Sequence, residues 1–221
     1  MPKKMSPDLV SGSDTQEVKK KPGRPRLDEP SPEYLSMRID IIEAAAKVFQ
    51  ERGYDAGTLK EVADEIGITT GNIYYYLKNK QELLYEIILR SVNIALKNIN
   101  QVLMKEEDAG RRLRAFMEYH IDMMMKEQYM FSVFFEQREK LQPKHSRIIR
   151  DKEREYIGLF RKTIDEAVDH GYIPDIKSDH AFHAILGMCN WVYKWYKPST
   201  KVTAQDLADE WFKLLALPGK Q

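Results

Sequence analysis

The chain has 221 residues, of which 43% are hydrophobic and 31% are charged, and its formal net charge is +1 at pH 7. It is long enough to bury one large hydrophobic core or two modest ones. Because the net charge is close to zero, nucleic-acid binding cannot be inferred from bulk charge and must be argued from where the basic residues cluster.

Three other features of the sequence narrow the class of protein. Glycine is sparse and strong helix formers are common, which predicts an all-α fold. No window reaches the roughly 18 consecutive apolar residues of a transmembrane helix, and the N-terminus lacks the apolar segment of a signal peptide. The single cysteine, Cys189, excludes an internal disulfide framework and suits the reducing cytoplasm, where we expect the protein to act.

Residues 1–32 are rich in Pro, Ser, Asp and Lys and have no apolar periodicity, which predicts a disordered arm. The densest basic cluster of the chain, residues 19–26, lies in this arm. Its Gly-Arg-Pro segment at Arg24 resembles the core of an AT-hook, although a proline precedes the glycine where a basic residue is usual. Arg24 and Arg26 are therefore predicted to enter an A·T-rich minor groove, where the negative potential is deepest. The alternative is a solvated tail without DNA contacts.

Residues 58–80 have the pattern of two short helices around a tight turn. Thr58 followed by Glu61 is a capping-box pattern at the start of the first helix. Gly67 stands where a helix end favours a left-handed residue, and Thr69 or Thr70 can cap the second helix. This is the layout of a helix-turn-helix, in which the start of the second helix meets base edges in the major groove. Any two amphipathic helices joined through a glycine share this bare pattern, so the flanking residues matter.

Those flanking residues extend the pattern to about fifty residues without a gap. The positions that carry it are Phe49, Gly53, Tyr54, Thr58, Ala63, Gly67, Ile68, Tyr74, Lys80, Leu83 and Leu84. On these positions, residues 38–90 resemble the N-terminal DNA-binding domain of the TetR family of bacterial repressors. The one departure is Leu77, where many members carry Phe, and it is a conservative apolar change.

The resemblance implies which residues contact DNA. The predicted major-groove residues are Thr70, Gly71, Asn72, Tyr74 and Tyr75. Thr58, Lys60 and Lys80 are expected at the phosphates, where contacts fix the register without reading the sequence.

The apolar period continues through the rest of the chain and predicts helices only. A long connecting helix runs from Lys80 to about Gln101, and the next carries residues 113–124. A segment rich in Met and Phe follows, and Pro143 breaks it from a long helix that Gly171 ends. The last two predicted helices span about 178–196 and 203–215, with Thr203 as a cap.

The last two helices are apolar over wider faces than one small core requires. We therefore predict that they pair with a second copy to form a homodimer, with Val192, Leu207, Trp211 and Leu215 in the interface. The TetR resemblance implies the same arrangement. In the alternative, both apolar stripes are interior to one subunit.

Residues 187–198 resemble a branch of the TetR family whose members respond to acyl-CoA thioesters. The adjoining Met and Phe residues would suit an acyl chain, and the basic residues after them would suit the phosphates of CoA. The predicted ligand-binding residues are Phe116, His120, Met124, Phe131, Phe134, Phe135, Arg138, Asn190, Trp191 and Trp195. A plain core and a solvated charged helix face are the alternatives for these two groups.

Together, these observations predict a basic arm over residues 1–32, a helix-turn-helix domain over 33–80 and a ligand-binding and dimerisation domain over 81–221. The predicted function is a DNA-binding regulator, a repressor of lipid or acyl-CoA catabolism genes that an apolar effector such as an acyl-CoA releases from its operator. We expect no enzymatic activity, no cofactor and no metal site. The alternative functions are a dimeric acyl or lipid carrier with a purely structural helix-turn-helix, and a repressor that responds to a protein partner.

Overall fold

The computed structural model describes residues 30–216, and these form an all-α fold without a strand, as the sequence predicts. The basic cluster and the predicted minor-groove residues Arg24 and Arg26 lie outside the described residues. Within residues 30–216, no helix combines the length and apolar character that crossing a membrane requires.

The first helices build the helix-turn-helix. They are α1 (Pro32–Arg52), α2 (Leu59–Glu65) and α3 (Thr70–Tyr76). Phe49, Val62, Ile73 and Leu77 are buried among them and belong to the continuous apolar core of the described chain. This part of the core holds α2 and α3 in a fixed geometry.

Local signals in the sequence set the ends of α2 and α3. The Thr58 hydroxyl accepts a hydrogen bond from the Glu61 backbone N–H at 3.1 Å, and the Glu61 carboxylate accepts one from the Thr58 N–H at 2.8 Å. This reciprocal pair is the predicted capping box. Gly67 follows α2 with φ of 69°, the left-handed region that glycine occupies at least cost. Thr69, and not Thr70, caps α3.

The remaining helices form the larger part of the described chain. They are α4 (Lys80–Lys105), α5 (Ala109–Lys126), α6 (Gln128–Gln137), the 3₁₀ turn η1 (Arg138–Lys140), α7 (Pro143–Asp169), α8 (Ser178–Trp195) and α9 (Ala204–Leu215). The connecting helix α4 extends one turn past the predicted end at Gln101. Pro143 and Gly171 bound α7 as predicted, because proline suits a first helical turn and Gly171 adopts a positive φ of 70°.

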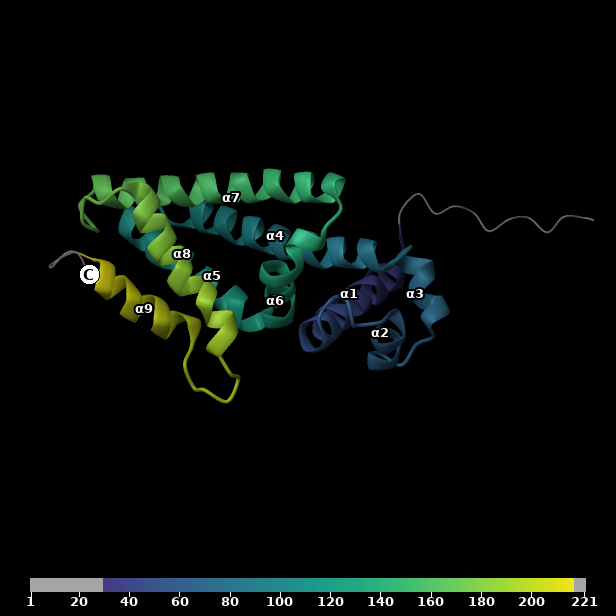
Figure 1. Cartoon of the computed structure of the whole chain (residues 1–221). Helices are drawn as coiled ribbons and strands as arrows, with labels where there is room; N and C mark the ends of the chain where they lie inside the picture. The colour runs from purple at the N-terminus through teal and green to yellow at the C-terminus, as the bar shows by residue number, and fades with distance from the viewer. Residues whose placement is uncertain (1–29, 217–221) are drawn as a thin grey trace, which may run out of the picture. The chain divides into compact units, whose positions relative to one another are not determined.

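Figure 1 shows how these helices are layered. The two longest, α4 and α7, run alongside one another, and α5 packs against both α8 and α9. Helix α6 lies between α4 and α8 and also packs on α1. Helix α4 begins against α1 of the DNA-binding helices and continues along α5, α6 and α7. A change in the tilt of α4 would therefore move the DNA-binding helices relative to the other helices.

Candidate DNA-binding surface and effector cavity

Helix α3 presents the predicted DNA-reading residues to solvent. Ile73 is fully buried against the other helices, whereas Gly71, Asn72, Tyr74 and Tyr75 are exposed and Thr70 is partly exposed. Tyr75 is 70% exposed, which is unusual for a side chain with so much apolar surface. The exposed face of α3 is therefore available for a partner, and a major groove admits a helix of this kind.

Two of the predicted phosphate contacts are exposed, and the third has an internal partner. Thr58 and Lys60 both face solvent. Lys80 instead donates a hydrogen bond from Nζ to the Asp55 backbone oxygen at 3.1 Å and lies 4.6 Å from the centre of the Tyr54 ring. Burial lowers the pKa of Lys80. In this structure, Lys80 ties the start of α4 to the loop between α1 and α2.

A cavity of about 250 Å³ lies among α4, α5, α6, α7 and α8. Of the predicted ligand-binding residues, His120, Met124, Phe131, Phe134, Phe135, Arg138 and Asn190 line it. The other lining residues are Ser91, Val92, Ala95, Met123, Glu153, Tyr156, Ile157, Phe182, His183 and Leu186. The wall is mainly apolar with a few polar groups, as is typical of sites for apolar small molecules.

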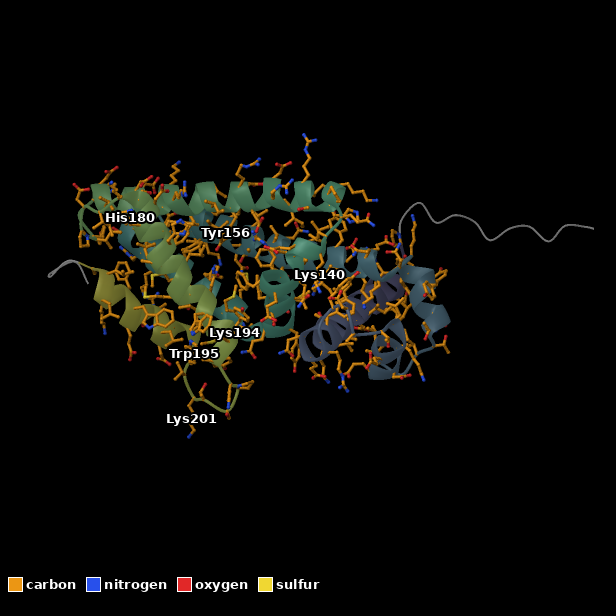
Figure 2. All side chains as sticks on the ribbon, viewed as in Figure 1. Lys140, Tyr156, His180, Lys194, Trp195 and Lys201 are labelled. Carbon is orange, nitrogen blue, oxygen red and sulfur yellow. The ribbon has the colours of Figure 1, made fainter. Side chains whose placement is uncertain are left out.

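A chain of hydrogen bonds crosses this apolar wall. The Nδ1 atom of His120 lies 2.5 Å from the Tyr156 hydroxyl, and its Nε2 atom lies 2.8 Å from the side-chain amide oxygen Oδ1 of Asn190. Burial lowers the pKa of His120 to about 4 and raises the pKa of Tyr156 well above its usual value. Figure 2 shows Tyr156 near the middle of α7, beside α8.

An ion pair borders the same cavity. Arg138 pairs with Glu153, and its guanidinium lies 5.5 Å from the centre of the Phe134 ring. Burial raises the pKa of Glu153, although the nearby Arg138 opposes this effect. The Arg138 side chain is 46% exposed, so this edge of the cavity reaches solvent.

The turn η1 links the cavity to the DNA-binding helices. Lys140, two residues after Arg138, forms an ion pair with Asp55 in the loop between α1 and α2. The Lys140 backbone oxygen accepts a hydrogen bond from the Gln81 side chain at 3.2 Å, at the start of α4. Figure 2 shows Lys140 at this junction.

Three predicted ligand-binding residues are not part of the cavity wall. Phe116 is buried behind it and stacks on Phe160 with ring centres 3.8 Å apart. Trp191 and Trp195 are 61% and 40% exposed, so they face away from the cavity. Their assignment to the ligand site is corrected, because the rotation of α8 directs Asn190 inward and the neighbouring Trp191 outward.

The interface prediction also needs correction. Val192 is completely buried within the subunit and Leu207 is 8% exposed, so neither presents a surface to a second copy. The apolar face that α8 turns outward carries Ala184, Gly187, Trp191 and Trp195. On α9, Leu214 is exposed, and the predicted residues Trp211 and Leu215 are partly exposed.

The sequence interpretation missed Tyr156 and Glu153. Tyr156 lies seven residues after the buried Ile149 and four before the buried Phe160, which places it on the inner face of α7. This helical spacing was the available signal for a polar group inside the core. Glu153 gave no such signal, because it stands in a stretch of alternating charges that suggests a solvated face.

Comparison with known proteins agrees with this geometry. Residues 41–87 match the family described as bacterial regulatory proteins, tetR family, and residues 106–217 match the tetracyclin repressor-like C-terminal domain. The HTH-type transcriptional repressor KstR2 of Mycobacterium tuberculosis is 22% identical over 193 residues, covering 86% of this chain and 96% of the relative.

Two solved structures have the same fold. The TetR family regulator PfmR from Thermus thermophilus has a TM-score of 0.72 at 26% identity, covering 79% of this chain and 95% of that chain. AibR in complex with isovaleryl coenzyme A and operator DNA has a TM-score of 0.72 at 23% identity, covering 81% and 97%. Both parts of the described fold thus match one family over most of the chain. This protein is a member of the TetR family of bacterial transcriptional regulators and binds DNA through its helix-turn-helix.

Proposed function

We infer that the chain is a homodimeric cytoplasmic repressor of genes for lipid or acyl-CoA breakdown, and that an acyl-CoA releases it from its operator. We assign it no catalytic activity. The observation that carries the proposal is the cavity, because its Met and Phe wall suits an acyl chain and Arg138 stands at its exposed edge. The ligand class named for AibR supports testing thioesters first.

The cavity volume sets what part of the effector it can enclose. At about 250 Å³, the cavity is slightly smaller than most small-molecule sites, so we expect it to enclose an acyl group and to leave CoA outside. Each buried methylene contributes about 0.8 kcal/mol. Affinity is therefore expected to rise with acyl-chain length and to stop rising when the cavity is full.

Calorimetry with CoA and a series of straight-chain acyl-CoAs tests this proposal directly. CoA alone is expected to bind poorly, and the tightest member should also release the protein from DNA in a mobility-shift competition. Linkage requires that this member binds the DNA complex less tightly than it binds the free protein, by the same factor by which it lowers the operator affinity. If none of the series binds more tightly than about 100 μM, well above the range of specific effectors, the acyl-CoA proposal fails and a protein partner becomes the leading alternative.

We further propose that η1 passes the ligand signal to the DNA-binding helices. A CoA phosphate that draws Arg138 away from Glu153 would move a three-residue turn whose other end holds Asp55 and Gln81. This would change the tilt of α4 and therefore the spacing of the two copies of α3. Release needs only that the ligand prefers the spacing that does not fit DNA.

Replacing Lys140 with Ala is expected to weaken this coupling without abolishing either binding event. An exposed ion pair contributes about 0.2–1 kcal/mol, so the ratio of operator affinities without and with effector should change by up to about fivefold. Asp55→Ala should have the same effect, and the double variant should add nothing further. Lys144→Ala, an exposed lysine at the start of α7, is the control. If the ratio of operator affinities without and with effector is the same in Lys140→Ala, Lys144→Ala and the wild type, η1 does not pass the ligand signal to the DNA-binding helices.

A further inference from the structure

Besides the ion pair of Arg138 with Glu153, the cavity wall contains three polar side chains that are hydrogen-bonded to one another. Tyr156, His120 and Asn190 come from α7, α5 and α8 and form one hydrogen-bonded chain. By contrast, the hydroxyl of Ser91 donates to the Ile87 backbone oxygen at 2.9 Å. Three helices thus bring three polar side chains to one place in a wall that is otherwise mostly Met, Phe and aliphatic.

The direction of each hydrogen bond in this chain follows from its end groups. The Asn190 carbonyl oxygen can only accept, so the Nε2 atom of His120 carries the proton and donates to it. The Nδ1 atom of His120 then has a free lone pair and accepts from the Tyr156 hydroxyl. Because burial holds the pKa of His120 near 4 and raises the pKa of Tyr156, both side chains are neutral at pH 7.

The bonds already formed leave specific capacity for a ligand. His120 has used both ring nitrogens, and the Tyr156 hydroxyl has used its proton but keeps lone pairs. The Asn190 amide nitrogen donates to none of the described residues. These hydrogen-bonded side chains therefore offer a ligand the amide donors of Asn190 and an acceptor at the Tyr156 hydroxyl, all of them uncharged. A ketone oxygen can accept from Asn190, and a hydroxyl can also donate to Tyr156, so these groups suit an uncharged oxygen better than a carboxylate.

We propose that the effector carries an uncharged oxygen, a ketone or a hydroxyl, within its acyl group, and that the Asn190 amide binds this oxygen inside the cavity. This inference rests on the proposed acyl-CoA response. Depth distinguishes this oxygen from the thioester carbonyl. Asn190 is partly buried and is bonded to His120, which is only 4% exposed, whereas the Arg138 side chain that would meet CoA is 46% exposed. The thioester must lie near that exposed edge, because CoA does not fit in the cavity.

The test compares matched ligands by calorimetry. The probes are straight-chain acyl-CoAs from butanoyl to decanoyl, and the same series with a ketone or a hydroxyl on the penultimate carbon. The wild type should bind at least one oxygenated member about three- to tenfold more tightly than its hydrocarbon counterpart, since one added hydrogen bond contributes about that factor. Asn190→Leu, which keeps the side-chain size, should reduce this preference to within about twofold.

A matched control separates the cavity from general effects of the substitution. Asn100→Leu makes the same chemical change on α4, where the Asn100 amide donates to the Leu96 backbone oxygen at 2.9 Å outside the cavity wall. It should keep the wild-type preference. Thermal unfolding of both variants establishes that each is folded at the temperature of the titrations.

Each other outcome has a definite meaning. If Asn190→Leu weakens hydrocarbon and oxygenated thioesters by the same factor, Asn190 binds the thioester carbonyl and the inference is wrong. If acyl-CoAs bind and release DNA but the wild type shows no preference, the chain of hydrogen bonds is structural only and the proposed function stands alone. If no acyl-CoA binds but the corresponding ketones or alcohols without CoA bind through Asn190, the oxygen site stands and the acyl-CoA proposal fails.

Discussion

Gly187→Glu is expected to convert the protein into a folded monomer, because it would bury an unpaired charge in the dimer interface. The operator affinity of this monomer should be lower by about a hundredfold or more. Gly187 lies on the outward apolar face of α8 with Ala184, Trp191 and Trp195, and a Cβ atom added there meets no atom of its own subunit within 4 Å. In a dimer paired through this face, the new carboxylate would be buried opposite its own copy. Each monomer would then keep only half of the DNA contacts.

An identical substitution elsewhere provides the control for Gly187→Glu. Gly158 is exposed on α7, and a Cβ atom added there also meets nothing within 4 Å. Gly158→Glu should therefore remain dimeric and bind the operator normally. Analytical ultracentrifugation at micromolar concentration, with anisotropy titrations on a DNA site selected by the wild type, measures both quantities. A wild type that sediments as a monomer, or a Gly187→Glu protein that remains a dimer, would contradict pairing through α8.

Gly71→Leu is expected to lower specific operator affinity by about a hundredfold or more, toward the level of non-specific binding. Gly71 is exposed in the first turn of α3, and the nearest atom to an added Cβ is the Thr69 hydroxyl at 3.6 Å. The added Cβ atom therefore makes ordinary van der Waals contact at an exposed position, and replacing a helical glycine contributes up to about 1 kcal/mol of stability. The leucine would instead stand between the backbone of α3 and the floor of the major groove.

The measurements for Gly71→Leu are the melting temperature and the operator affinity of the same preparation. Gly158→Leu is the matched control, because it adds the same side chain to an exposed helical glycine on α7. We expect both variants to melt no lower than the wild type and only Gly71→Leu to lose specific binding. Wild-type affinity in Gly71→Leu would show that α3 does not approach the base edges closely, and would remove Gly71 from the predicted contacts.

The all-α class, the helix-turn-helix and most helix ends of this protein could be predicted from its residues alone. These features depend on interactions between residues a few positions apart. The capping box of Thr58 and Glu61 spans three residues, and the turn at Gly67 needs only a residue that tolerates positive φ. Proline at the start of α7 and glycine after its end act through the local backbone in the same way. These signals can be recognised in the sequence because the hydrogen bonds and backbone angles behind them involve only neighbouring residues.

Which residues of α8 face the cavity, the core or the outside could not be predicted from the sequence and follows from how the helices pack. Apolar periodicity places residues on faces, but α8 is apolar around most of its circumference, so its period does not give its rotation. Packing on α5 and α7 fixes that rotation and buries Val192 while exposing Trp191. For this reason Val192, predicted in the interface, lies in the core, and Trp191 and Trp195, predicted at the ligand, lie on the outward face.

The polar chain in the cavity and the link through η1 also depended on the tertiary structure. His120 and Asn190 are 70 residues apart, and Lys140 and Asp55 are 85 apart. No local pattern encodes such a pair, because its members meet only when several helices have packed in one register. The sequence therefore specified a DNA-binding helical regulator, whereas the polar groups of its cavity and their link to the DNA-binding helices follow from how α4 to α8 pack together.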